Sequence, residues 1–326
     1  MGNILLGFNC NCFTNRYDEP EVWTKLCHDM GIRHVMFNVD LIDPNWSWET
    51  QKRLCDRTLE ACDKYGVRIF ASFGGHHGHQ HYMGHFDDGA RQEAILFFKN
   101  AVRQTAYLGG KSFGTCFSIM TARVNDDPVL RRQCIDHAID GYERVAEYAA
   151  GQGLEALAYE MTSIPRESCA TFAENDEILE RCSRMAVPMR ICLDMGHRNM
   201  NGLPEEADHL AWIRRYGRFC DVIDCQQTDM SASHHWPFTY ENNIKGIIRG
   251  QEVVDAIRQS GAQQDILLAF ELRSSAYYPQ DDRHLESLRD SVAYWRRFIR
   301  EPSETSKIGQ EVPVDVISDS LLQNTR

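Results

Sequence analysis

Short apolar segments alternate with longer amphipathic segments along most of the chain. The expected strands are the short runs at 4–8, 34–38, 67–72, 112–115, 154–160, 189–194, 222–226 and 266–271. The helical patterns cover 19–30, 48–65, 90–108, 128–151, 174–184, 205–215, 251–260 and 282–299. Regular strand–helix alternation indicates a parallel sheet whose strands are joined by helical crossovers.

Eight such units in roughly 300 residues match a single (β/α)₈ TIM barrel. A doubly wound open sheet is the alternative, but no Gly-x-Gly-x-x-Gly turn follows the first strand, so dinucleotide binding lacks support. We therefore expect residues 1–300 to form one TIM-barrel catalytic domain. Residues 301–326 form a polar C-terminal tail, which we expect to wrap the surface, to lie at an oligomer contact, or to be disordered.

Several of the apolar runs end in a carboxylate. Glu160 ends the fifth run, Asp194 the sixth and Glu271 the eighth, while Gln226 ends the seventh. Burial of an unpaired charge is costly, so an apolar run has no packing reason to end in an acid. A single acid at such a place is ordinarily a capping or ion-paired residue, but the repetition points to a shared positive partner.

The carboxyl ends of barrel strands converge on one face, where the active site of such a barrel lies. Glu160, Asp194, Gln226 and Glu271 are therefore expected to meet there. Carboxylates with a neutral oxygen or nitrogen donor suit a hard divalent cation, and we predict Mn²⁺ or Mg²⁺ as the cofactor.

Histidines follow three of the expected strands, the third, the sixth and the seventh. His197 comes three residues after Asp194 and is expected to contact substrate or metal. His234 and His235 precede Trp236 in a loop that is typical of a substrate-facing lid or of a packed surface turn. His76 begins a histidine-rich loop after the third strand, and its spacing fits no zinc template.

Composition and charge disfavour a nucleic-acid-binding, a membrane or a secreted protein. The net charge is −12, from 35 basic and 47 acidic residues, which disfavours a nucleic-acid groove. No segment reaches the roughly 20 apolar residues of a membrane span, and the first residues lack a signal-peptide pattern. Twelve cysteines without an export signal are expected to be free thiols in a reducing cytoplasm.

The motifs at the strand ends resemble those of the xylose-isomerase-like barrels over about residues 4–299. They are Ala158-Tyr-Glu160-Met, Cys192-Leu-Asp194-Met-Gly-His197, Gln226-Gln-Thr-Asp229 and Phe270-Glu271. That family includes ketose 3-epimerases, sugar isomerases, inosose dehydratases and apurinic endonucleases. Gln226-Gln-Thr-Asp229 followed by His234-His-Trp-Pro-Phe238 is most similar to its erythritol-catabolism branch, which acts on erythrulose phosphates.

The resemblance implies a metal-dependent ketose-phosphate 3-epimerase that works through an enediolate. Glu160, Asp194 and Glu271 would bind the metal, and Glu160 and Glu271 would also be the acid–base pair. The family usually has histidine where this chain has Gln226, and the histidine-rich loop is a second departure. An aldose–ketose isomerase or an inosose-type dehydratase at the same site is the alternative. An apurinic endonuclease and a non-catalytic sugar or metal binder are more distant alternatives.

The expected partner is a small sugar or sugar phosphate, with no nucleic acid and no membrane. The substrate-binding candidates are His76, His197, His234, His235 and Arg273, and Arg198 is a further candidate for the phosphate. Related barrels commonly form dimers or tetramers, so we expect a homo-oligomer located in the cytoplasm.

Overall fold

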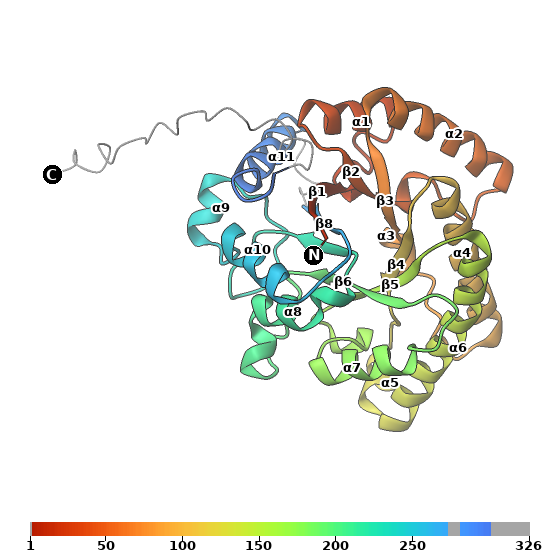
Figure 1. Cartoon of the computed structure of the whole chain (residues 1–326). Helices are drawn as coiled ribbons and strands as arrows, with labels where there is room; N and C mark the ends of the chain where they lie inside the picture. Colours follow the sequence, from red (N-terminus) through yellow and green to blue (C-terminus); the bar gives the residue numbers. More distant parts are fainter. Residues whose placement is uncertain (1, 273–280, 301–326) are drawn as a thin grey trace, which may run out of the picture.

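Eight parallel strands close into a barrel in sequence order (Figure 1). The computed structural model describes residues 2–272 and 281–300. The strands are β1 (Ile4–Asn9), β2 (His34–Asn38), β3 (Arg68–Phe73), β4 (Ser112–Cys116), β5 (Ala156–Met161), β6 (Met189–Asp194), β7 (Val222–Cys225) and β8 (Ile266–Phe270). Parallel pairing of β8 with β1 closes the sheet. The predicted (β/α)₈ barrel is confirmed, and the open sheet is wrong.

Helices surround the barrel as an outer ring (Figure 1). The main ones are α1 (Pro20–Asp29), α2 (Trp48–Tyr65), α4 (Asp88–Tyr107), α6 (Pro128–Gln152), α7 (Phe172–Arg181), α8 (His209–Tyr216), α10 (Gly250–Gln259) and α11 (Asp281–Trp295). Local signals set their ends. The Asp127 side chain accepts hydrogen bonds from two backbone N–H groups at the start of α6, and Gly153 ends that helix at φ 83°.

Short elements that periodicity did not predict lie in the loops. They are the helices α3 (Gly75–Gly78), α5 (Ala122–Asp126) and α9 (Tyr240–Lys245), and the 3₁₀ turns η1 (Cys10–Cys12), η2 (Val39–Leu41), η3 (Pro165–Glu167), η4 (Pro204–Ala207) and η5 (Gly217–Phe219). The predicted helix 205–215 is wrong in its first turn. Asp208 is extended and caps a new helix by accepting from the Leu210 N–H, so α8 begins only at His209.

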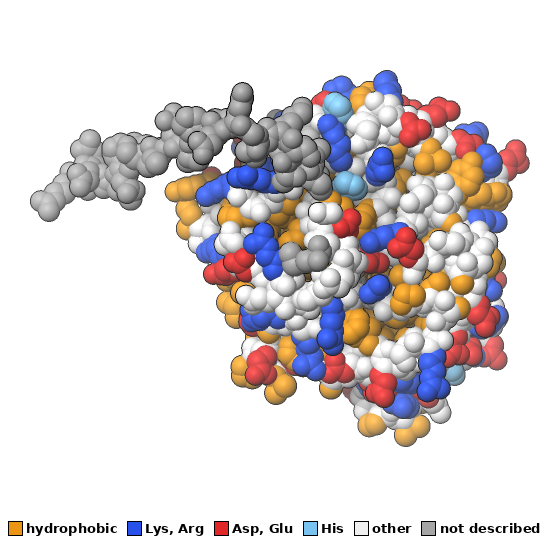
Figure 2. All heavy atoms as spheres, in the orientation of Figure 1, with side chains coloured by type: hydrophobic (Ala, Val, Ile, Leu, Met, Phe, Trp, Pro, Cys, Tyr) orange, Lys and Arg blue, Asp and Glu red, His pale blue; other side chains and the backbone are white. Residues whose placement is uncertain are grey.

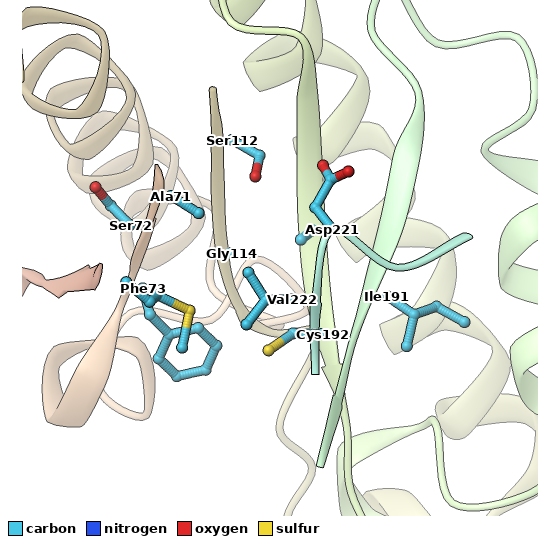
Figure 3. Close-up of a pocket in the computed structure, with 11 residues that line it drawn as sticks. Ala71, Ser72, Phe73, Ser112, Gly114, Ile191, Cys192, Asp221 and Val222 are labelled. Carbon is cyan, nitrogen blue, oxygen red and sulfur yellow. The ribbon is translucent and has the colours of Figure 1, made fainter. Parts of the chain in front are cut away.

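The strands divide their side chains between two apolar regions. On β8, Leu268 and Phe270 pack outward against the helices, whereas Leu267 and Ala269 belong to the barrel interior. Small side chains leave a cavity inside the barrel, and Figure 3 shows residues around it, among them Ala71 and Val222. None of the predicted site residues within 2–272 lines this cavity, whose walls are mainly apolar.

Many charged side chains lie on the surface (Figure 2), whereas the cysteines are buried. Basic and acidic side chains are interspersed over the face shown in Figure 2, without a large region of one sign. No helix within residues 2–272 and 281–300 is long and apolar enough to cross a membrane. All twelve cysteines are free and buried, as expected for structural thiols.

Two glycine substitutions test the packing of the barrel. A Cβ at Gly7 would lie 2.3 Å from the His34 carbonyl oxygen and 2.7 Å from Leu267 Cδ1, whereas a Cβ at Gly151 in α6 would meet nothing within 4 Å. We expect Gly7→Ala to lower the free energy of unfolding by about 1–3 kcal/mol. Gly151→Ala should raise it by about 0.5–1 kcal/mol. Urea titrations measure both, and equal effects would contradict the described packing.

Candidate active site

The polar residues predicted from the strand ends meet at one end of the barrel. Glu160 is the penultimate residue of β5 and Asp194 the last of β6, while Gln226 and Glu271 directly follow β7 and β8. All four side chains are buried. Gln226 Nε2 donates to both carboxylate oxygens of Asp194 at 2.8 Å. The strand ends therefore bring these groups into contact, as the barrel predicts.

His197 bridges two of the acids. Its Nδ1 lies 3.1 Å from Glu160 Oε1, and its Nε2 lies 3.8 Å from Asp194 Oδ2. Burial alone would lower the pKa of His197, but the Asp194 and Glu160 carboxylates outweigh it and raise the pKa to about 10. The two carboxylates thus favour the protonated form of His197.

His235 reaches the cluster from the loop after β7. Its Nδ1 lies 3.3 Å from Glu271 Oε2 and 4.0 Å from Asp194 Oδ2, and its side chain is 4% exposed. The Glu271 carboxylate also accepts a hydrogen bond from Asn11 in η1 at 3.1 Å. Sequence reasoning missed Asn11, because nothing in the sequence shows that η1 lies beside the end of β8.

The two glutamates differ in their electrostatic environments. Burial raises the pKa of Glu160, and the hydrogen bond from His197 only partly offsets it. Burial would likewise raise the pKa of Glu271, but His235 outweighs it and the pKa falls below its usual value. Carboxyl groups whose pKa values are pushed in opposite directions suit opposite acid and base roles.

Asp224 is a fourth buried acid that sequence reasoning missed. It lies inside β7, is fully buried, and accepts a hydrogen bond from the Cys192 thiol at 3.2 Å. Burial raises the pKa of Asp224 well above its usual value. It stands two residues before Gln226, on the same face of the strand, and this spacing is the signal that could have found it.

Other predicted residues lie away from the carboxylates. The His234 ring stacks on Trp236 at 4.0 Å, and its Nε2 lies 3.0 Å from Asp229 Oδ1. His76 pairs with Asp40, and its side chain is 90% exposed. Arg198 is buried and donates to the Asp229 carbonyl oxygen. Arg273 falls outside the described residues.

The histidine-rich loop brings a different histidine toward the barrel. His79 Nε2 lies 3.5 Å from Cys116 Sγ and 3.9 Å from Glu167 Oε1. This His79–Cys116–Glu167 group combines residue types that can bind a metal. The sequence analysis chose His76 as the substrate-binding candidate of this loop. In the structure the His76 ring pairs with Asp40.

Comparison with known sequences identifies the family. The chain matches the family described as xylose isomerase-like TIM barrel over residues 24–298. The chain belongs to this family. It is also 32% identical, over 94% of its own length and 99% of the relative's, to the D-erythrulose 1-phosphate 3-epimerase of Brucella abortus (strain 2308). The family and the erythrulose-phosphate branch predicted from the motifs are thereby confirmed, and the chain is an enzyme of the isomerase class.

Solved structures agree with this xylose isomerase-like fold. A Rhodospirillum rubrum protein with the provisional name xylose isomerase superposes with a TM-score of 0.83 at 24% identity, over 91% of this chain and all of that one. The 3-keto-D-glucoside 4-epimerase YcjR of E. coli gives a TM-score of 0.65 at 15% identity, over 90% of this chain and all of that one. At these identities the similarity concerns the fold.

The polar cluster of this xylose isomerase-like barrel fits a divalent cation. The possible ligand atoms of Glu160, Asp224 and Glu271 lie within 4.8 Å of one another, as do those of Asp194, His197 and His235. Asp224 Oδ1 and Glu271 Oε2 are buried, and neither accepts a hydrogen bond from the residues that the structure describes. Like charges this close in a buried site call for a positive partner.

The buried acid Asp224 leads to a prediction on pH and stability. Because its folded-state pKa lies above its unfolded value, the folded protein binds more protons than the unfolded chain between these two values. The stability contributed at Asp224 therefore falls as the pH rises. Asp224→Asn removes this loss, so the metal-free variant should gain stability over wild type, and gain more at pH 8 than at pH 5.

Urea unfolding at several pH values measures this difference. Asp126→Asn, at the exposed end of α5, is the matched control and should show little change at any pH. A difference between wild type and Asp224→Asn that stays constant or shrinks with rising pH would contradict the assignment.

Proposed function

We propose that the protein is a metal-dependent ketose-phosphate 3-epimerase that acts on a four-carbon substrate such as erythrulose phosphate. One observation carries the proposal: Glu160 and Glu271 come from β5 and β8 and enter the same buried cluster with pKa values shifted in opposite directions. The similarity to the Brucella abortus 3-epimerase supports the choice of substrate.

Residues of the cluster can perform the proton transfers. The C–H bond beside a ketone is weakly acidic, and its loss leaves an enediolate. In one direction the ionised Glu271 takes the C3 proton and the protonated Glu160 returns one from the opposite face, which yields the C3 epimer. In the reverse direction the two roles exchange. The contact of 3.1 Å between His197 Nδ1 and Glu160 Oε1 holds the Glu160 carboxyl in place, and we assign His197 a contact with a substrate oxygen.

Glu160, Asp194 and Glu271 are the residues that would hold the metal, and Mn²⁺ or Mg²⁺ is proposed. A bound divalent cation would polarise the ketone and lower the pKa of the C3–H bond. Gln226 was predicted as a fourth ligand of the metal. The roles of His76, His234 and Arg273 as substrate or phosphate contacts, the homo-oligomeric dimer or tetramer, and the cytoplasmic location stay predictions.

Proton NMR in D₂O tests the reaction. With metal-supplemented enzyme and erythrulose 1-phosphate, we expect deuterium at C3 together with the C3 epimer. Exchange with an aldose product would favour the isomerase alternative, and loss of water from the substrate would favour the dehydratase. No exchange with any short ketose or ketose phosphate would contradict the enediolate mechanism.

Single glutamate variants test the two-base assignment. Glu160→Gln and Glu271→Gln should each lower the epimerisation rate by about 10²–10⁴-fold, because each removes one proton-transfer group. Each variant should still exchange deuterium into the one epimer whose C3 proton faces the remaining glutamate. Loss of exchange from both epimers in both variants, with metal still bound, would argue against this assignment.

Metal removal tests the dependence on a cation. Dialysis against a chelator should abolish turnover, and Mn²⁺ or Mg²⁺ should restore it. The far-ultraviolet circular dichroism spectrum should stay unchanged, because the barrel core holds together without the metal site. Full activity after removal of metal, verified by elemental analysis, would show that the proposed dependence is wrong.

A further inference from the structure

The loop after β7 folds back onto the end of its own strand. Gln227 and Trp236 exchange two backbone hydrogen bonds of 2.8 and 3.0 Å, which pin residues 228–235 as a closed loop. His235 directly precedes this bridge, so its backbone position is set by β7 although it lies nine residues beyond Gln226. The loop thereby carries an imidazole back to a strand end where the sequence has none.

The amide group of Gln226 has a defined orientation. Its Oε1 accepts from the His235 backbone N–H at 2.6 Å and from Ser233 Oγ at 3.1 Å. Its Nε2 donates to both oxygens of Asp194. Reversal of the amide would place an NH₂ group against the His235 N–H and an oxygen against a carboxylate, so the network permits one orientation. The Gln226 oxygen therefore faces the loop backbone. Its nitrogen faces Asp194 and the His235 ring, whose Nδ1 lies 3.1 Å and whose Nε2 lies 3.3 Å from it.

His235 occupies a backbone conformation that side chains rarely adopt. Its φ is 52°, in the left-handed region, and the residue is buried. Such a conformation costs free energy and persists where surrounding contacts enforce it, commonly at functional sites. The hydrogen bond to Gln226 and the Trp236 bridge supply that enforcement here. The strained backbone directs Nδ1 toward Glu271 Oε2 and Asp194 Oδ2, and Nδ1 also lies 3.2 Å from the Glu271 carbonyl oxygen.

We propose that His235 is the nitrogen ligand of the divalent cation and that Gln226 is the positioning residue that aims it. This inference rests on the metal dependence in the proposed function and assigns His235 a different role from the substrate contact predicted from the sequence. His235 would add a nitrogen to the proposed carboxylate ligands Glu160, Asp194 and Glu271. His197 stays with Glu160, and its ring lies 5.4 Å from that of His235 at 77°.

A ligand set of carboxylates and one imidazole has a consequence for metal choice. Imidazole suits Mn²⁺, Co²⁺ and Zn²⁺ better than Mg²⁺, which favours oxygen ligands. The enzyme should therefore bind Mn²⁺ more tightly than Mg²⁺, and His235→Asn should narrow this difference. Asparagine is suitable because it tolerates a positive φ and keeps a polar side chain in place.

Electron spin-echo spectroscopy of the Mn²⁺ complex tests the assignment without a measurement of activity. Wild type should show the coupling of an imidazole nitrogen, which changes when histidine is labelled with ¹⁵N. His235→Asn should lose this coupling and bind Mn²⁺ at least about tenfold more weakly. His234→Asn is the matched control, because its ring faces Asp229, and it should retain both the coupling and the affinity. Circular dichroism checks that each variant is folded.

Three outcomes would overturn the inference. The coupling could persist in His235→Asn, vanish in His197→Asn alone, or be absent from a wild-type complex that binds Mn²⁺ and turns over substrate. Any of these would leave the epimerase proposal standing, whereas wild type that binds no divalent metal at all would remove both. The two failures are therefore distinguishable.

A double-mutant cycle tests the role of Gln226. Gln226 also donates to the ligand Asp194, so part of its effect does not pass through His235. If Gln226 positions His235, then Gln226→Ala weakens Mn²⁺ binding clearly less in His235→Asn than in wild type. If Gln226 is itself a ligand, the two substitutions weaken binding independently and their effects multiply. The second result would return Gln226 to the ligand set and contradict its positioning role.

Discussion

Repulsion among buried carboxylates is the constraint to which the rest of the site responds. Two like charges 4 Å apart repel by about 4 kcal/mol at an effective dielectric constant of 20. Different partners offset the repulsion at each acid of the cluster. Glu160 is paired with His197, Glu271 with His235 and Asn11, and Asp194 with the amide of Gln226. Asp224 receives only a thiol, and its pKa is raised the most clearly.

This constraint also explains why the site is built from so many separate segments. A strand places only every second side chain on the face that looks into the site, so each strand end offers few groups there. Most partners of the acids therefore come from the loops after the strands, as His197 and His235 do. The closed barrel makes this possible, since β1 and β8 are hydrogen-bonded neighbours and bring Asn11 to Glu271.

The sequence predicted the strands and the strand-end acids because both leave a local pattern. Each apolar run is a strand, and an acid at its end has no other packing explanation. Asp224 was not predicted, because an acid inside an apolar run is not distinguished by a position at the end of the strand. The short helix α9 and the helix start at His209 escaped because a few residues carry no measurable period, so capping side chains such as Asp208 decide them.

The sequence did not predict the orientation of the Gln226 amide or the position of the His235 ring, for a different reason. Both depend on which groups become neighbours after the loop has closed, and the Gln227–Trp236 bridge that closes it joins residues nine positions apart. A residue type can suggest a ligand, but the direction of an amide is a property of its hydrogen-bond network. Motifs therefore predict which residues gather at the strand ends more readily than they predict the direction in which each side chain acts.

The twelve buried thiols have a consequence for the chemistry of the unfolded chain. Burial raises the pKa of thiols such as Cys10, Cys27 and Cys225, so almost no thiolate exists for an oxidant to attack while the barrel is intact. Unfolding exposes all of them together at their ordinary reactivity. If wrong disulfides form in air before the chain refolds, the lifetime of the enzyme is governed by its rate of unfolding rather than by its equilibrium stability.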